Sequence, residues 1–216
     1  MLKSNKHIFW EALIITIVIF LMGLFLGMMI EAGHSNEINN FYLASEANLI
    51  DGMALSQISG GSHISCETIK QKNIDFANKV YEEAKLLEKY ESSQKLTENL
   101  KIIHKKYDLL RTLAWISNSN SLEQCQNYDL VIYLYEYNSE NITKKAIQNV
   151  WSKILLDVKE ENEDMILIPI ASDQDITSLE VLMEKYGVSS FPALVINNQE
   201  VIYSLEGSDQ IKSLLN

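Results

Sequence analysis

The hydrophobic and polar positions divide the chain into three stretches with different periods. Residues 12–30 read ALIITIVIFLMGLFLGMMI and contain no charged side chain. With residues 8–11 added, a helix of this length crosses a hydrocarbon core of about 30 Å. We therefore predict a transmembrane helix over residues 8–30, after a tail of residues 1–7. A cleaved signal peptide is the alternative. However, the apolar run is longer than the apolar region of a signal peptide, which usually has about 7–15 residues, and MIEAGHS is a poor cleavage site.

The charges that flank this apolar run predict its orientation. Lys3, Lys6 and His7 precede it, whereas Glu31 and Glu37 follow it. Positive residues favour the cytoplasmic side of a membrane. The tail is therefore expected in the cytoplasm, and the rest of the chain is expected outside the cell membrane as the ectodomain of a single-pass protein.

Two pairs of glycines mark this helix and its continuation. Gly23 and Gly27 form a G-x-x-x-G pattern, which lets two membrane helices approach closely and predicts self-association. Apolar residues then recur near a helical period, which predicts a helical stalk over residues 31–61. Gly60 and Gly61 are expected to end this stalk, because adjacent glycines destabilise a helix.

Residues 62–126 carry two amphipathic patterns on either side of Ser92 and Ser93. Each has the period of a helix, and the polar connection between them is short. We predict an antiparallel helical hairpin of the coiled-coil type. The expected core positions are Ile69, Asn73, Phe76, Val80, Ala84 and Leu87 in the first helix and Leu96, Leu100, Ile103, Tyr107, Leu110 and Ala114 in the second.

The two cysteines of the chain fall at the open end of this hairpin. Cys66 begins the first helix and Cys125 follows the second, and in an antiparallel pair of equal helices those ends meet. A disulfide bond is expected there, since an extracytoplasmic domain is where disulfides persist. The alternative is a separated redox pair, but neither cysteine has the C-x-x-C setting that activates a thiol.

Residues 127–216 alternate between strand and helix patterns in the order β-α-β-α-β-β-α. The first two strands, joined by a helix, are expected to be parallel, and NNQ is expected to join the last two as a hairpin. A short helix is expected to end at Gly187. The helix over residues 142–161 is expected to bury Ala146, Val150, Ile154 and Val158.

Residues 186–207, YGVSSFPALVINNQEVIYSLEG, resemble the thioredoxin-fold superfamily. The resemblance implies a thioredoxin-like domain over residues 127–216, in which Phe191 precedes a cis Pro192. It further implies that this proline faces the loop containing Tyr137 and Asn138, and that the backbone there can pair with an extended peptide. The whole layout of span, hairpin and C-terminal domain resembles uncharacterised single-span archaeal membrane proteins.

The chain departs from this family at the loop before the helix of residues 142–161. Redox-active members carry C-x-x-C there, but this loop reads YNSENITKK and contains no cysteine. Ser139 or Asn141 is expected to cap the helix instead, and neither side chain can exchange disulfides. Asn141 and Thr143 also form an N-x-T sequon, a potential N-glycosylation site.

Composition and motifs exclude several classes of function. The chain has 29 acidic and 18 basic residues and a net charge of −11, which argues against nucleic acid and anionic membrane surfaces as partners. It has no phosphate-binding loop, nucleophile elbow or metal-ligand spacing, so no cofactor or metal is expected. His104 is expected to pack or lie on the surface. Asp173 and Asp175 suggest a cation site, but Asp175 or a neighbour is more simply a helix cap.

These patterns favour a membrane-anchored, redox-inactive, thioredoxin-like binding or scaffold protein of unknown partner. An extended segment of another protein is expected to bind near Phe191 and Pro192. One alternative is a thiol-disulfide oxidoreductase or isomerase that uses Cys66 and Cys125. The other is a purely structural assembly protein.

Overall fold

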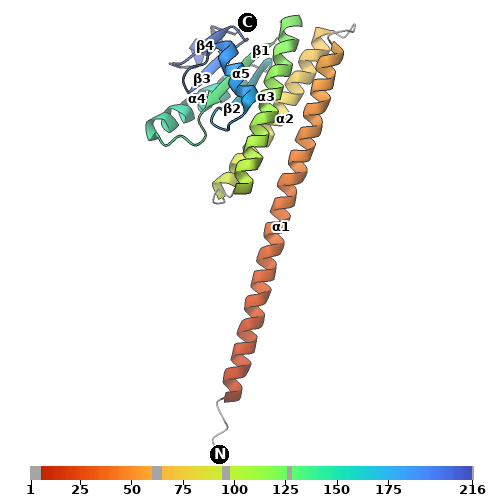
Figure 1. Cartoon of the computed structure of the whole chain (residues 1–216), viewed down its shortest axis with the longest axis vertical. Coiled ribbons are helices and arrows are strands. Elements are labelled where there is room, and N and C mark those ends of the chain that lie inside the picture. Colours follow the sequence, from red (N-terminus) through yellow and green to blue (C-terminus); the bar gives the residue numbers. More distant parts are fainter. Residues whose placement is uncertain (1–5, 60–64, 94–97, 126–127, 216) are drawn as a thin grey trace, which may run out of the picture. The chain divides into compact units, whose positions relative to one another are not determined.

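The structure, a computed structural model of the whole chain, describes residues 6–59, 65–93, 98–125 and 128–215. Figure 1 shows its elements in chain order. The chain forms two compact units, Met1–Leu43 and Ala44–Asn216. The predicted break at Gly60 and Gly61 and the predicted core residue Leu96 lie outside the described residues.

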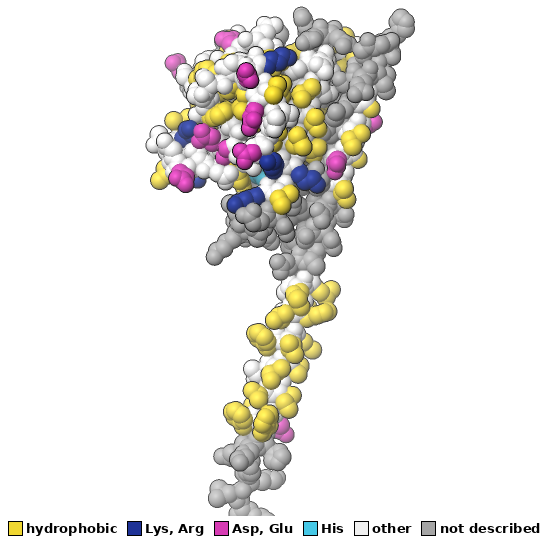
Figure 2. All heavy atoms as spheres, in the orientation of Figure 1, with side chains coloured by type: hydrophobic (Ala, Val, Ile, Leu, Met, Phe, Trp, Pro, Cys, Tyr) yellow, Lys and Arg dark blue, Asp and Glu magenta, His cyan; other side chains and the backbone are white. Residues whose placement is uncertain are grey.

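The helix α1 (Lys6–Ser59) contains the predicted transmembrane helix and most of the predicted stalk. Its segment Phe9–Met29 has a mean hydropathy of 2.7, and the large apolar side chains there are exposed (Figure 2). The segment is long and apolar enough to span a membrane, and a signal sequence would share these features. A side chain added at Gly23 or Gly27 would meet nothing within 4 Å, so this face of the helix is open.

The helices α2 (Cys66–Ser93) and α3 (Glu98–Gln124) form the expected hairpin and contact each other. The expected disulfide bond is present: Cys66 and Cys125 are joined with a Cα–Cα distance of 5.3 Å. At the start of α2, the hydroxyl oxygen of Ser65 accepts a hydrogen bond from the Thr68 amide, which satisfies a backbone donor of the first turn. The expected core positions that are buried are Ile69, Asn73, Tyr107, Leu110 and Ala114.

The C-terminal part of the second unit is an α/β region with a mixed four-stranded sheet in the order β2-β1-β3-β4. The strand β1 is parallel to β2 and antiparallel to β3, and β3 is antiparallel to β4. The strands and helices follow the expected order along the chain. They are β1 (Asp129–Tyr135), α4 (Ile142–Glu161), β2 (Met165–Ala171), α5 (Thr177–Tyr186), β3 (Ala193–Ile196), β4 (Glu200–Ile202) and α6 (Ser208–Lys212).

The buried face of α4 differs from the expected one. Of the four expected residues, Val158 is buried and Ile154 is partly buried, but Ala146 and Val150 are exposed; the helix also buries Gln148, Trp151 and Leu155. The prediction was wrong for Ala146 and Val150 because both sides of α4 carry apolar residues, so the helical period alone does not select one side. The tryptophan removes more apolar area from water than a valine does. The polar side chain of Gln148 can be buried because its amide forms hydrogen bonds with both the backbone N–H and the carbonyl of Glu136, at 2.9 and 3.0 Å.

Tight turns end α5 and join the last two strands. Gly187 ends α5 in the left-handed region at φ 70°, as expected from the sequence. Asn197 and Asn198 have φ of 50° and 58°, a conformation that asparagine tolerates better than most residues. The side chain of Asn197 also accepts a hydrogen bond from the Leu130 amide at 2.8 Å, which ties the turn to β1.

Polar contacts join the hairpin to the sheet within the second unit. The hydroxyl of Tyr128 donates to the Asn118 carbonyl at 3.0 Å and accepts from the Asn73 side chain at 3.4 Å. The Trp115 indole N–H donates to the Asn198 side chain at 3.2 Å. The hairpin and the α/β region therefore pack as parts of one compact unit.

The disulfide bond is expected to stabilise this unit. Replacing both cysteines (Cys66→Ser with Cys125→Ser) should lower the free energy of unfolding by about 2–4 kcal/mol, because the bond closes a long loop in the unfolded chain. Urea unfolding of the full chain in detergent, followed by tryptophan fluorescence, measures this difference. An unchanged unfolding midpoint would show that the bond does not constrain the unfolded state.

Alkaline pH is expected to destabilise the second unit through Tyr128. Burial raises the pKa of Tyr128 from 10.0 to about 12, against the opposing effect of hydrogen bonds with Asn73 and Ser121. The unfolded chain therefore loses this proton first, so the stability held by the neutral phenol is complete below pH 10 and is lost as pH rises towards 12. Urea unfolding between about pH 9 and 11.5 should show this fall, and Tyr128→Phe should show a smaller one. An equal loss of unfolding free energy in the unchanged protein and in Tyr128→Phe would show that Tyr128 does not cause the effect.

Candidate functional site

The residues that the sequence predicts to bind a peptide lie at one end of the sheet. Leu134 pairs with Ala193, so the carboxyl end of β1 lies beside the start of β3. This register brings the loop after β1, which contains Tyr137 and Asn138, to the same end as Phe191. The Phe191–Pro192 peptide bond is cis. We call Tyr137, Asn138 and Phe191 the strand-end rim; Pro192 is buried behind it.

A carboxylate holds the loop side of this rim. The two oxygens of Asp173 accept hydrogen bonds from the amides of Tyr137 and Asn138, at 2.8 and 2.7 Å. Asp173 follows β2, so it ties the loop after one parallel strand to the end of the next. The expected cap at Asp175 is wrong, because no side chain caps α5, whose N-cap residue is Ile176.

The main chain of Phe191 lies on the other side of the rim. Its amide and carbonyl form no hydrogen bond with any residue that the structure describes. The side chain is half-buried, and the preceding Ser190 is exposed. A backbone donor and acceptor that are both unpaired at the end of a strand can pair with an extended chain.

The start of α4 has no thiol. Of the two residues expected to cap this helix, Asn141 is the N-cap. Its side chain accepts a hydrogen bond from the Lys144 amide at 3.1 Å. Asn141 and Thr143 of the sequon are both exposed. The two cysteines are bonded to each other, and Cys125 is 3% exposed.

A second feature, which the sequence did not predict, is a cavity of about 480 Å³ between the hairpin, α4 and the edge strand β2. Five tyrosines line it, together with His104, Arg111 and Lys145. We call it the tyrosine cavity. Its tyrosines are Tyr81, Tyr107, Tyr133, Tyr135 and Tyr137.

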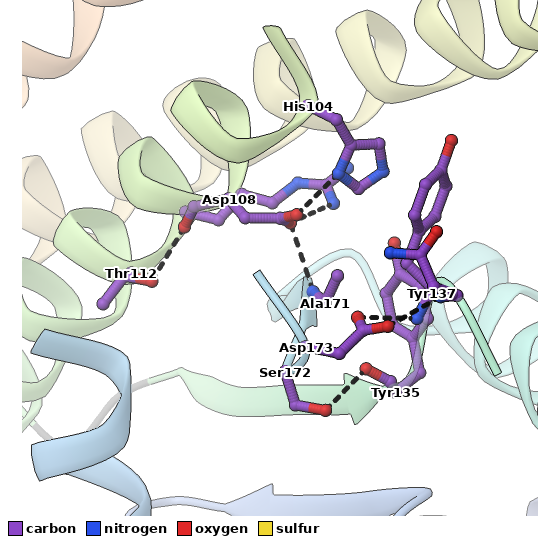
Figure 3. A network of polar contacts seen from close by, with 10 residues as sticks. His104, Asp108, Thr112, Tyr135, Tyr137, Ala171, Ser172 and Asp173 are labelled. Atoms are coloured by element: carbon purple, nitrogen blue, oxygen red, sulfur yellow. Dashed lines mark hydrogen bonds and ion pairs between the residues drawn. The ribbon is translucent and has the colours of Figure 1, made fainter. Parts of the chain in front are cut away.

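The buried carboxylate of Asp108 organises the hairpin side of this cavity. Its side chain is 0% exposed; one oxygen lies 3.2 Å from Nη1 of Arg111 and the other 2.8 Å from Nδ1 of His104. The first oxygen also accepts a hydrogen bond from the Ala171 amide at the end of β2, at 3.2 Å. Figure 3 shows His104 and Asp108 pointing toward each other, with Ala171 below them. Asp108 thus links α3 directly to the sheet.

Arg111 keeps its charge despite its burial. Desolvation opposes the charge, but Tyr107, Asp108 and Tyr135 together raise the pKa of Arg111 above its ordinary value. The guanidinium lies over the Tyr107 ring, 4.3 Å from its centroid, a favourable cation–π arrangement. The cavity therefore contains a permanent positive charge that one buried carboxylate balances.

The tyrosines of β1 form a continuous aromatic wall. The rings of Tyr133 and Tyr135 stack with their centroids 5.5 Å apart, and the Tyr133 hydroxyl donates to the Gln148 carbonyl at 3.0 Å. Burial, and then the neighbouring Tyr135, raise the pKa of Tyr133. His104 lies against Tyr137, with ring centroids 3.9 Å apart. Tyr137 therefore belongs both to the strand-end rim and to the tyrosine cavity.

Local signals for this cavity were present in the sequence. Tyr133, Tyr135 and Tyr137 recur at the period of a strand, and His104 and Asp108 have the spacing of neighbours on a helix. His104 is buried, as one of the two expected placements. No cluster of three or more potential metal ligands occurs in the part of the chain that the structure describes.

No protein-family model matches this chain, and no curated protein or solved structure matches it. Similarity therefore assigns neither a family nor an activity to the chain.

Removal of the Asp108 carboxylate is expected to destabilise the second unit strongly. Asp108→Ala should cost about 3–5 kcal/mol of unfolding free energy, because it leaves the Arg111 charge buried without its partner. The matched control is Asp75→Ala on α2, whose carboxylate is 45% exposed and contacts Lys72 at 3.4 Å. That change should cost less than about 1 kcal/mol. Urea unfolding of both variants measures the difference, and similar costs would contradict this role of Asp108.

Proposed function

We propose that this chain is a membrane-anchored, extracytoplasmic binding module with a redox-inactive, thioredoxin-like C-terminal domain. The module binds an extended segment of another protein at the strand-end rim. The mixed sheet, the order of its helices and the cis Pro192 before β3 support the thioredoxin-like assignment.

The anchor and the compartment rest on two features of the chain. The apolar segment Phe9–Met29 is long enough to hold the chain in a membrane. The Cys66–Cys125 disulfide bond suits an oxidising environment outside the cytoplasm. The basic tail before the segment favours a cytoplasmic N-terminus, so the second unit is the part that meets extracytoplasmic partners.

The unpaired main chain of Phe191 is the observation that carries the binding proposal. The amide and carbonyl of this residue, just before β3, lack partners among the described residues. Such a pair of groups can form two hydrogen bonds with one residue of an extended partner, and these bonds do not depend on the partner's sequence. The opposite side of the rim is held in place, because Asp173 fixes the amides of Tyr137 and Asn138.

Thiol chemistry is the less favoured function. A catalytic thiol needs exposure and a setting that stabilises the thiolate. Cys125 is almost fully buried and bonded to Cys66. The start of α4, the position at which redox-active members of the thioredoxin-fold superfamily carry their cysteines, is capped by Asn141.

A photo-crosslinking residue at position 191 is expected to capture the partner. The full chain, with p-benzoylphenylalanine in place of Phe191, is irradiated in membranes of its own host. We expect a discrete higher-mass product, since the rim holds the partner next to this side chain. Gel separation and mass spectrometry of the product identify the captured protein and its segment.

Two controls make this experiment decisive. The same photo-residue replaces Val181 on α5, which is apolar, 60% exposed and not one of the rim residues, and it should not give the product. A Cys66→Ser variant tests the thiol alternative, because an exchange partner would be trapped on Cys125 as a mixed disulfide. Products that are identical at both photo-residue positions, or a trapped mixed disulfide, would contradict the proposal.

A further inference from the structure

The tyrosine cavity has the properties of a ligand site that is separate from main-chain pairing at Phe191. Its volume of about 480 Å³ falls within the range of small-molecule pockets, about 300–1,000 Å³. Its walls include Tyr107 and Arg111 from α3, Tyr133 and Tyr135 from β1, and Lys145 from α4. Neither Phe191 nor Pro192 lines it.

Arg111 gives this cavity an unsatisfied donor. The side chain is 6% exposed, and its Nη1 is occupied by Asp108 at 3.2 Å. Its Nε has no acceptor among the described residues. An unpaired buried N–H destabilises the folded protein, so an acceptor oxygen in the cavity would remove this penalty. The guanidinium is planar and charged, which suits a carboxylate best.

The balance of charges around the cavity is positive and favours an anion. Arg111 is balanced by Asp108, and Glu136 is balanced by Lys144 at 2.7 Å. Lys145 also lines the cavity, is exposed, and has no ion pair among the residues that the structure describes. Among the charged groups that the structure describes around the cavity, one positive charge thus remains, although the whole chain carries a net charge of −11.

The aromatic walls favour a flat ligand. The stacked rings of Tyr133 and Tyr135 and the ring of Tyr107 offer faces and edges to a second aromatic group. Offset or edge-to-face contacts between such rings stabilise a complex beyond the burial of apolar area.

We propose that the tyrosine cavity binds a small aromatic carboxylate. The carboxylate accepts from Nε of Arg111 and is attracted by Lys145, and the ring lies among the tyrosines of α3 and β1. This inference goes beyond the proposed partner binding at the strand-end rim, and it holds or fails independently of it.

Calorimetric titration of the full chain in detergent tests this proposal. The probes are phenylacetate and indole-3-acetate, each compared with its neutral amide and, for phenylacetate, with the saturated-ring cyclohexylacetate. We expect each acid to bind at least about tenfold more tightly than its amide, since the amide cannot form the charge-assisted bond. Phenylacetate should bind about two- to tenfold more tightly than cyclohexylacetate.

Matched variants locate the binding. Lys145→Gln should weaken acid binding about two- to fivefold, whereas Lys153→Gln, an exposed lysine of the same helix that does not line the cavity, should leave it unchanged. Arg111→Lys, which keeps the charge and removes Nε, should abolish the preference for acid over amide. Lys145→Gln keeps the proposal testable if Arg111→Lys fails to fold.

Several results would overturn the proposal. They are the binding of none of the acids, equal affinity for acids and amides, equal affinity for the flat and saturated rings, or equal losses in Lys145→Gln and Lys153→Gln. None of these results bears on capture of a partner at position 191, so failure here is distinguishable from failure of the proposed function.

Discussion

The buried carboxylate of Asp108 is the contact on which the arrangement of the second unit depends. It pairs with Arg111 and His104 of its own helix and accepts a hydrogen bond from the Ala171 amide at the end of β2. A charge without access to water is tolerated only where donors surround it. The Ala171 amide is the one of these groups that comes from outside α3, so its hydrogen bond with Asp108 fixes how α3 docks on the sheet. That docking sets Tyr107 opposite the tyrosines of β1 and so creates the cavity.

The disulfide bond and the carboxylate of Asp173 also constrain the second unit, each at a different place. The Cys66–Cys125 bond closes the open end of the hairpin and limits the unfolded chain. Asp173 acts at the sheet end, where its two oxygens fix the loop that contains Tyr137. Two carboxylates of a strongly acidic chain thus serve as acceptors within the fold. The strand-end rim and the tyrosine cavity meet at Tyr137, on a loop that one of these carboxylates positions.

The sequence predicted those features whose signals are local or repeated. Helical and strand periods predicted the order of the elements, and the positions of Cys66 and Cys125 in the hairpin predicted their bond. The buried face of α4 was missed because that helix is apolar on two sides, and only the fit of Trp151 against the sheet decides between them. Asp173 was interpreted as part of a local site, whereas its partners lie in the loop after β1. The cavity was missed because it requires α3 and β1 to be placed against each other, which no period in either segment specifies.

The net charge of the chain does not conflict with an anion site inside it. A net charge of −11 repels a small anion at long range, but at about 0.1 M salt such fields fade within about 10 Å. The repulsion therefore acts mainly on the rate of approach. Discrimination depends on groups in contact with the ligand, and Arg111 is screened little by salt because it is buried. The proposed main-chain pairing at Phe191 involves no charge at all, so the two proposed sites depend on different chemistry.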